Sequence, residues 1–121
     1  MALKINIAGT EIEYLDALET EEFYNGSKRR TMTVICLPDA INVDTLNALL
    51  TEDNLASVIM ADTETGAVNI YDGYVLKLAC GIKNEQVRAE TPDTAAVYAD
   101  RLVFKLGKRT YIEEQLHKLG L

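Results

Sequence analysis

The last quarter of the chain constrains the fold more than any other stretch, because it combines an alternating strand pattern with a capped helix. From residue 96 to residue 106, one face of the pattern is apolar, while the other face is half apolar and half charged. The apolar face consists of Tyr98, Leu102, Phe104 and Leu106. Gly107 ends the alternation, and Thr110 and Glu113 then have the spacing of a capping box. This stretch therefore predicts a long strand followed by a terminal helix.

The predicted terminal helix is amphipathic and needs a surface to pack against. Ile112, Leu116 and Leu119 lie at helical spacing on one side, and Tyr111 flanks them. A helix of about ten residues is only marginally stable on its own. It can pack on the sheet of its own chain, which is the simpler expectation, or it can dock on a neighbouring subunit. In the second case Tyr111, Ile112, Leu116 and Leu119 form a partner interface.

The rest of the chain consists of short strand patterns separated by turns, with one helical pattern from 43 to 50 that Asn42 or Asp44 can cap. Further strands are expected at 2–8, 11–18, 31–37, 56–61, 67–71 and 74–82, the last with an extension to 87 left open. Turn residues occur at 8–9, 25–26, 62–66 and 72–73. Asp72-Gly73 is either a tight turn or a bulge that kinks one long strand.

These elements predict one domain over residues 1–121, since single cores typically span about 100–150 residues. The gaps between strands are mostly of hairpin length, which favours antiparallel pairing. We therefore expect an α+β fold that is mainly antiparallel β. It should have about seven strands in a sandwich or open barrel, one short internal helix and a C-terminal helix.

The charge balance argues against a general nucleic-acid binder. The net charge is −7, from 19 acidic and 12 basic residues, whereas affinity for phosphate depends on Lys and Arg. The one basic cluster is Lys28-Arg29-Arg30. It is either a solvated turn beside a strand or a contact for phosphate or an acidic partner. Lys28, Arg29 and Arg30 therefore join the candidate interface.

The cysteines and the N-terminus indicate a protein of the reducing cytoplasm. Cys36 and Cys80 lie in apolar strand-like runs and are expected to be buried free thiols, whereas small secreted domains more often contain several paired cysteines. The N-terminal residues alternate apolar and polar side chains from the start, so no signal peptide is expected. No apolar run is long enough to span a membrane, so we expect no membrane contact.

No combination of residues indicates catalysis, a metal or a cofactor. The single histidine, His117, lies on the terminal helix, where complementing the helix dipole explains it more simply than a catalytic triad does. Asp62, Glu64 and Asp72 could gather around Ca²⁺, but the spacing of a calcium loop is missing. No glycine-rich phosphate loop opens a helix. We therefore expect a non-enzymatic protein that acts through protein contacts.

Three tyrosines provide an alternative function. Tyr71, Tyr74 and Tyr98 lie in strand patterns, and aromatic side chains on one sheet face can stack on sugar rings. The alternative is a small carbohydrate- or peptide-binding module. Tyrosines on strands also serve as half-buried packing residues, which would leave no such face.

The residues RLVFKLGKRTYIEEQLHKL (101–119) resemble the C-terminal end of a type of small protein from tailed bacteriophages and prophages of Gram-positive bacteria. The resemblance extends to four further segments. These are KINIAGTEIEY (4–14), YNGSKRRTMTVICL (24–37), LNALL (46–50) and YDGYVLKLACGI (71–82). It implies a virion-associated structural role in the tail or baseplate, with copies of itself or other tail proteins as partners. It brings no catalytic residues with it.

Overall fold

Two four-stranded antiparallel sheets make up most of the protein, whose computed structural model describes residues 3–24 and 26–120. The strands are β1 (Leu3–Ile7), β2 (Thr10–Tyr14), β3 (Asp16–Tyr24), β4 (Ser27–Cys36), β5 (Ser57–Asp62), β6 (Val68–Asp72), β7 (Leu76–Arg88) and β8 (Val97–Gly107). The helices are α1 (Val43–Leu49), α2 (Glu52–Leu55) and α3 (Tyr111–Lys118). The α+β, mainly antiparallel fold is confirmed, with eight strands in the described part of the chain.

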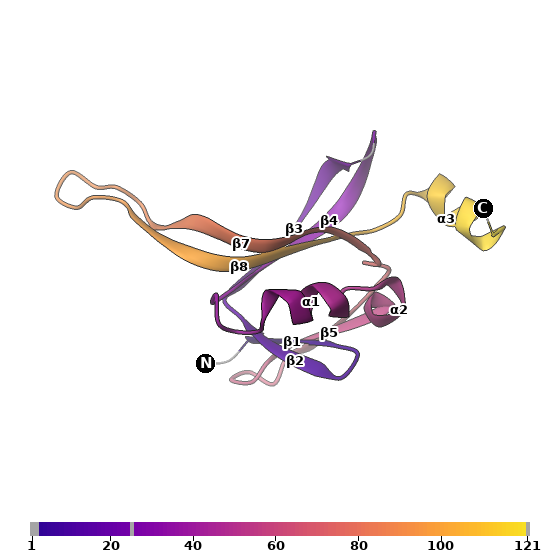
Figure 1. Cartoon of the computed structure of the whole chain (residues 1–121), viewed down its shortest axis with the longest axis horizontal. Helices are drawn as coiled ribbons and strands as arrows, with labels where there is room; N and C mark the ends of the chain where they lie inside the picture. Colours follow the sequence, from indigo (N-terminus) through magenta and orange to yellow (C-terminus); the bar gives the residue numbers. More distant parts are fainter. Residues whose placement is uncertain (1–2, 25, 121) are drawn as a thin grey trace.

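The first sheet has the strand order β2-β1-β5-β6, and the second sheet has the order β3-β4-β8-β7 (Figure 1). The chain first passes from one sheet to the other at Leu15, whose N–H donates to the carbonyl of Ile35 at 2.7 Å. The single strand expected from 11 to 18 is therefore two strands in different sheets. The alternation shifts by one position at Leu15, which follows the apolar Tyr14, but no glycine or proline marks the break.

The chain returns to the first sheet between β4 and β5, and it crosses to the second sheet again after β6, at Gly73. Gly73 has a φ of +90°, which a residue with a side chain rarely adopts. β6 belongs to the first sheet and β7 to the second, so both readings of Asp72-Gly73 are wrong. It is neither a tight hairpin turn nor a bulge within one strand. Gly73 instead lets the chain leave one sheet and enter the other.

The predicted hairpins have the expected turn chemistry. Ala8-Gly9 joins β1 to β2, and both residues have positive φ (50° and 86°). Gly66, with a φ of +76°, closes the loop from β5 to β6. β3 and β4 pair as far as Tyr24 opposite Ser27. The predicted turn between them includes Asn25, which lies outside the described residues.

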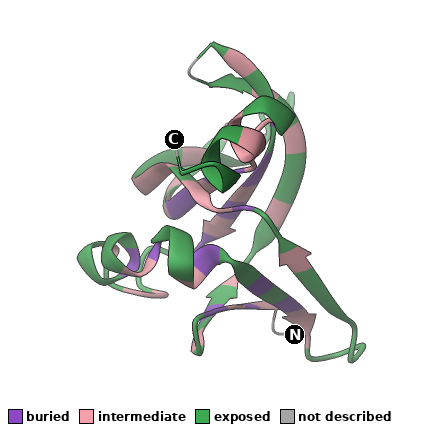
Figure 2. Ribbon diagram, turned by 90° about the vertical axis from the view of Figure 1, so that its right-hand side faces the viewer, coloured by how far each residue is buried: buried purple, intermediate pink, exposed green. Residues whose placement is uncertain are grey.

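Both sheets turn an apolar face toward one shared core, which the buried residues mark in Figure 2. In β1 and β5 the inward residues alternate with polar or exposed ones, and β8 buries the predicted face from Leu102 onward. The core residues are Ile5, Ile7, Ile12, Met32, Val34, Cys36, Leu46, Leu50, Leu55, Val58, Met60, Tyr74, Leu102, Phe104 and Leu106. Two separate sheets around one core correspond to the sandwich alternative.

Two short helices connect β4 to β5 and cover part of this core. The predicted helix is α1, and its cap is Asn42, whose side chain accepts from the N–H groups of Asp44 and Thr45. A second helix, α2, follows after Thr51, whose hydroxyl accepts from the N–H of Asn54 at 3.3 Å. The sequence pattern predicted only one internal helix. α2 has only four residues, and Leu55 is the only apolar one among them, so the sequence shows no helical periodicity there.

The β7–β8 hairpin extends beyond the sandwich as an arm (Figure 1). Its pairing contains two irregularities, between Lys77 and Ala79 and between Gln86 and Arg88. The predicted extension of β7 to residue 87 is confirmed. The arm and α3 lie at opposite ends of the longest axis of the molecule (Figure 1). The sandwich therefore holds two protruding elements far apart.

Candidate protein interface

Three residues separate the end of β8 at Gly107 from the start of α3 at Tyr111. The N–H of Lys108 still donates to the carbonyl of Arg30 at 3.0 Å, so the chain follows the second sheet to this point. The Thr110 hydroxyl accepts from the N–H of Glu113 at 3.3 Å, and a Glu113 oxygen accepts from the N–H of Thr110 at 2.9 Å. The predicted capping box is confirmed.

Glu113 also forms a two-pronged salt bridge with Arg29 of β4. Nη1 of Arg29 lies 2.5 Å from Oε1 of Glu113, and Nη2 lies 3.0 Å from Oε2. The same guanidinium donates to the backbone carbonyls of Lys108 and Tyr24, each at 3.1 Å. The Arg29 guanidinium, with help from the N–H of Thr110, lowers the pKa of Glu113 to about 2. One side chain therefore connects the β3–β4 hairpin, the linker and α3.

A second contact joins α3 and its linker to α2. Nη2 of Arg109 lies 2.6 Å from Oε1 of Glu52, and Nε2 of His117 lies 3.2 Å from the same oxygen. Arg109 lowers the pKa of the Glu52 carboxyl. His117 thus pairs with a carboxylate at the surface when it is protonated. The polar side of α3 faces the body of the protein through charged residues.

The apolar stripe of α3 is left exposed. The exposed fractions are 79% for Tyr111, 70% for Ile112, 43% for Leu116 and 73% for Leu119. No residue of α3 is buried, which Figure 2 shows along the helix near the C-terminus. The expectation that the stripe packs on its own sheet is wrong. Charged contacts hold the helix in place while its apolar side chains face water.

A groove of about 450 Å³ lies between α3 and the start of β7. Its apolar lining comes from Leu116 of α3 and from Val75, Leu76 and Leu78 beside it. Arg29 and Glu113 form its polar part, together with Tyr24, Lys77, Arg109 and His117. The groove extends the exposed stripe with further apolar surface, so the two form one continuous candidate interface.

The basic cluster does not form one surface patch. Lys28 and Arg30 are exposed and lie near Glu21 (3.4 Å) and Glu19 (3.6 Å), respectively. Arg29 lies between them on the strand and points to the opposite face, because successive strand residues alternate. Its side chain is only 1% exposed, so Arg29 is not available as a contact for phosphate or an acidic partner. It is an internal anchor instead.

The three tyrosines do not share a sheet face. Tyr74 is fully buried, and its hydroxyl donates to Glu19 at 2.5 Å. Burial and this hydrogen bond raise the pKa of Tyr74. Tyr71 packs edge-on against Tyr74, with ring centroids 6.3 Å apart, whereas Tyr98 lies exposed on β8 in the other sheet. The structure therefore gives the stacking surface of a carbohydrate site no support.

The remaining candidates for chemistry are accounted for by packing. Cys36 and Cys80 are free thiols, the first buried and the second partly buried. Burial raises the pKa of Cys36 to about 12 and also raises that of Cys80. Among residues 3–24 and 26–120, no three acidic, histidine or cysteine side chains are grouped to hold a metal ion. In the same residues, no helix is long and apolar enough to cross a membrane.

The sequence does not predict the ion pair between Arg29 and Glu113. The capping box accounts for Glu113 and the basic neighbours account for Arg29, so nothing in the sequence indicates that the two residues pair. The available signal is weak: Arg29 and Thr31 lie two positions apart on one strand and so point to the same face, and Thr31 is buried.

A comparison of this chain with protein-family models, with curated proteins and with solved structures gives no match.

Proposed function

We propose that this protein is a non-enzymatic structural component of the tail or baseplate of a tailed bacteriophage or prophage. It is made in the host cytoplasm and works as an oligomer, through contacts with copies of itself or with other tail proteins. The resemblance of residues 101–119 and of the preceding segments to small tail-associated proteins supports the setting. The exposed stripe of α3 supports the mode of action.

The observation that carries the proposal is that ion pairs hold α3 in place although none of its residues is buried. The bidentate pair between Arg29 and Glu113 fixes the helix, and Arg109 with Glu52 fixes its start. A large apolar side chain that leaves water gains about 1.5–3 kcal/mol. Four such side chains on a preformed helix can therefore supply most of the energy of a small interface, with little ordering cost on binding.

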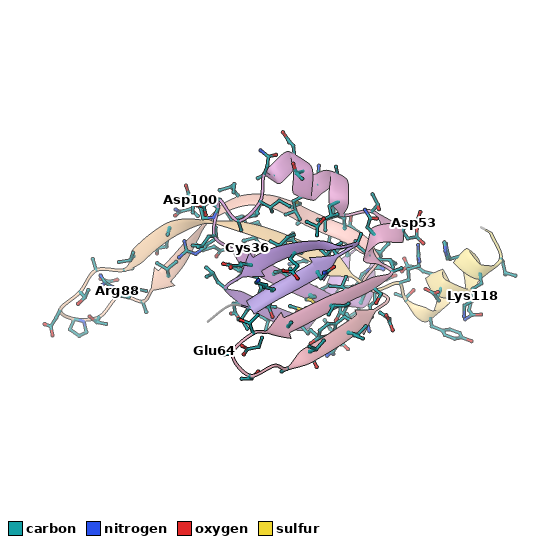
Figure 3. The ribbon with its side chains drawn as sticks, turned by 90° about the horizontal axis from the view of Figure 1, so that it is seen from below. Cys36, Asp53, Glu64, Arg88, Asp100 and Lys118 are labelled. Atoms are coloured by element: carbon teal, nitrogen blue, oxygen red, sulfur yellow. The ribbon has the colours of Figure 1, made fainter. Side chains whose placement is uncertain are left out.

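The arm supports the same function from the other end of the molecule. The β7–β8 hairpin exposes several apolar side chains, namely Ile82, Val87, Val97 and Tyr98. Figure 3 shows Arg88 on this arm and Lys118 on α3 at opposite ends of the molecule. Two contact elements at opposite ends suit head-to-tail association, in which each copy uses both.

The test replaces Ile112 and Leu119 by Gln in the full chain and measures mass by light scattering at concentrations near ~100 μM. We expect the parent to be an oligomer and the double variant to be a folded monomer. The matched control replaces Leu18 and Leu37 by Gln, because both are exposed and lie at the end of β3 and β4 remote from α3. The control should retain the mass of the parent.

A monomeric parent would contradict the oligomeric function directly. An oligomer that survives the change at Ile112 and Leu119 would remove α3 from the interface. Circular dichroism of each variant shows whether the sandwich is still folded, so that loss of mass is not confused with loss of structure.

A further inference from the structure

Strand β6 differs from the three other edge strands of the two sheets. An open edge invites pairing with another chain, and natural proteins usually protect it with charges or bulges. β2 carries Glu11 and Glu13, β3 carries several acidic residues, and β7 carries charges as well as two pairing irregularities. β6 has no charge from Val68 to Tyr71. It is the unprotected edge among these four strands, all of which lie in the described residues.

The backbone of β6 has hydrogen-bonding groups directed away from its sheet. The N–H of Asp62 donates to the carbonyl of Ala67 at 2.9 Å, so these two residues form a hydrogen-bonded pair of the β5–β6 ladder. Bonded and non-bonded pairs alternate along an antiparallel ladder. Asn69 and Tyr71 therefore bond to β5, whereas Val68, Ile70 and Asp72 direct their N–H and C=O groups outward. The edge offers these groups to a further strand.

Apolar side chains lie beside these backbone groups on the outer face of the first sheet. Val68 is 60% exposed and Ile70 is 63% exposed. Ile70 lies directly opposite Ile59 of β5, which is 37% exposed on the same face. The three side chains form a small apolar patch along the open edge. A strand added here can bury its own alternate apolar side chains against them.

Acidic residues adjoin both ends of this edge. Between Arg30 and Lys77 the sequence contains no Lys, Arg or His. Three acidic residues belong to the β5–β6 hairpin, namely Asp62, Glu64 and Asp72, and Lys108 lies beside Gly73, which follows Asp72. Asp72 ends β6, and the loop with Glu64 adjoins its start, as Figure 3 shows at the β5–β6 turn. Both ends of the apolar edge are therefore negatively charged.

We propose that β6 binds an extended segment of a partner protein, which joins the first sheet as a fifth strand. The segment carries two apolar side chains at alternate positions, beside Val68 and Ile70, and Lys or Arg on either side to face Asp72 and the acidic loop. A second copy of β6 fits less well. Centred on Ile70, it would bring its own Asp72 next to the acidic loop.

This inference rests on the proposed function in that both assign protein contacts to the chain, but it uses a surface separate from α3. The probe is a displayed library of random dodecapeptides, selected against the full chain. We expect the enriched peptides to combine apolar residues at alternate positions with flanking Lys or Arg. Fluorescence polarisation of these peptides then measures their binding to variants of β6.

Two variants separate backbone pairing from side-chain contact. Val68→Pro removes an outward N–H at the first residue of the strand and leaves the ladder to β5 intact. Ile70→Lys places a charge in the apolar patch. Each should weaken peptide binding by at least about tenfold, whereas Ile82→Lys, the same change at an exposed residue of β7, should not.

Failure to enrich such peptides, or enriched peptides that bind Val68→Pro as well as the parent, would overturn this inference. Dissociation of a parent oligomer by Val68→Pro would also overturn it, because a second copy would then occupy the edge. None of these results depends on Ile112 and Leu119. Failure here is therefore distinct from failure of the α3 interface.

Discussion

Arg29 on β4 and Glu113 on α3 are 84 residues apart in the sequence and are joined by two hydrogen bonds between their side chains. The arginine is buried, while the glutamate is partly exposed at the base of the helix. A bidentate pair fixes direction as well as distance. The orientation of α3, and with it the direction in which the exposed stripe faces, therefore depends on this contact.

Replacing Glu113 by Ala should destabilise the protein because it leaves the buried guanidinium without its carboxylate. We expect the free energy of unfolding to fall by about 1–3 kcal/mol, with water around the partly exposed Glu113 keeping the loss below that of a fully buried pair. Urea unfolding followed by circular dichroism measures it. Glu114→Ala is the matched control, since Glu114 lies 3.9 Å from Arg109 at the surface and should change stability by less than about 0.5 kcal/mol.

Acid should weaken the same contact. The pKa of Glu113 is lowered from 4.5 to about 2, mainly by the hydrogen bonds from Arg29. A carboxyl whose pKa is lower in the folded state contributes stability above its unfolded pKa and loses it as the pH falls. The urea midpoint should therefore drop between about pH 5 and pH 2. Lys105 lowers the pKa of Glu22 in the same direction, so Glu113→Gln should reduce the drop without abolishing it. An unchanged drop in Glu113→Gln would contradict the assignment.

Gly107 provides the space in which Arg29 reaches α3. A Cβ at this position would lie 2.8 Å from Cδ1 of Leu78 and 3.3 Å from Cδ of Arg29. Gly107→Ala should therefore force both side chains to shift and reduce stability by about 1–3 kcal/mol. Gly81→Ala is the control, because no atom lies within 4 Å of the added carbon there. Equal thermal midpoints for the two variants would show that the space beside Gly107 is not needed.

Local features of the sequence predicted much of the fold. The cap of α1 at Asn42, the capping box at Thr110 and the alternation that buries Leu102 and Phe104 each depend on residues close together in the chain. The switch between sheets at Leu15 could not be predicted. It depends on which strand Leu15 meets, namely Ile35, and no glycine or proline marks it.

The candidate site could be predicted only where it depends on a local sequence pattern. The stripe of Ile112, Leu116 and Leu119 is a periodic pattern and could be recognised from sequence. Whether it is covered depends on the tertiary structure. In the sequence Arg29 lies between two basic residues, as is typical of a solvated turn. Only the pairing of β4 with β8 brings it beneath α3. The open edge of β6 likewise follows from strand order, which no local pattern contains.

Shortening the chain after Lys108 shows whether α3 serves the fold or only the interface. The shortened chain keeps every core residue and loses Glu113, but the Lys108 oxygen that accepts from Arg29 becomes part of a terminal carboxylate. We expect it to stay folded, with a loss of stability no larger than that of Glu113→Ala, about 1–3 kcal/mol, because the terminal carboxylate remains beside Arg29. Urea unfolding of both proteins gives the comparison. A shortened chain that unfolds, or that loses several times more than the point variant, would place α3 in the core. A loss no larger than that of the point variant would mean that the stripe adds nothing to the isolated fold, so that its apolar side chains gain stability only when another protein covers them.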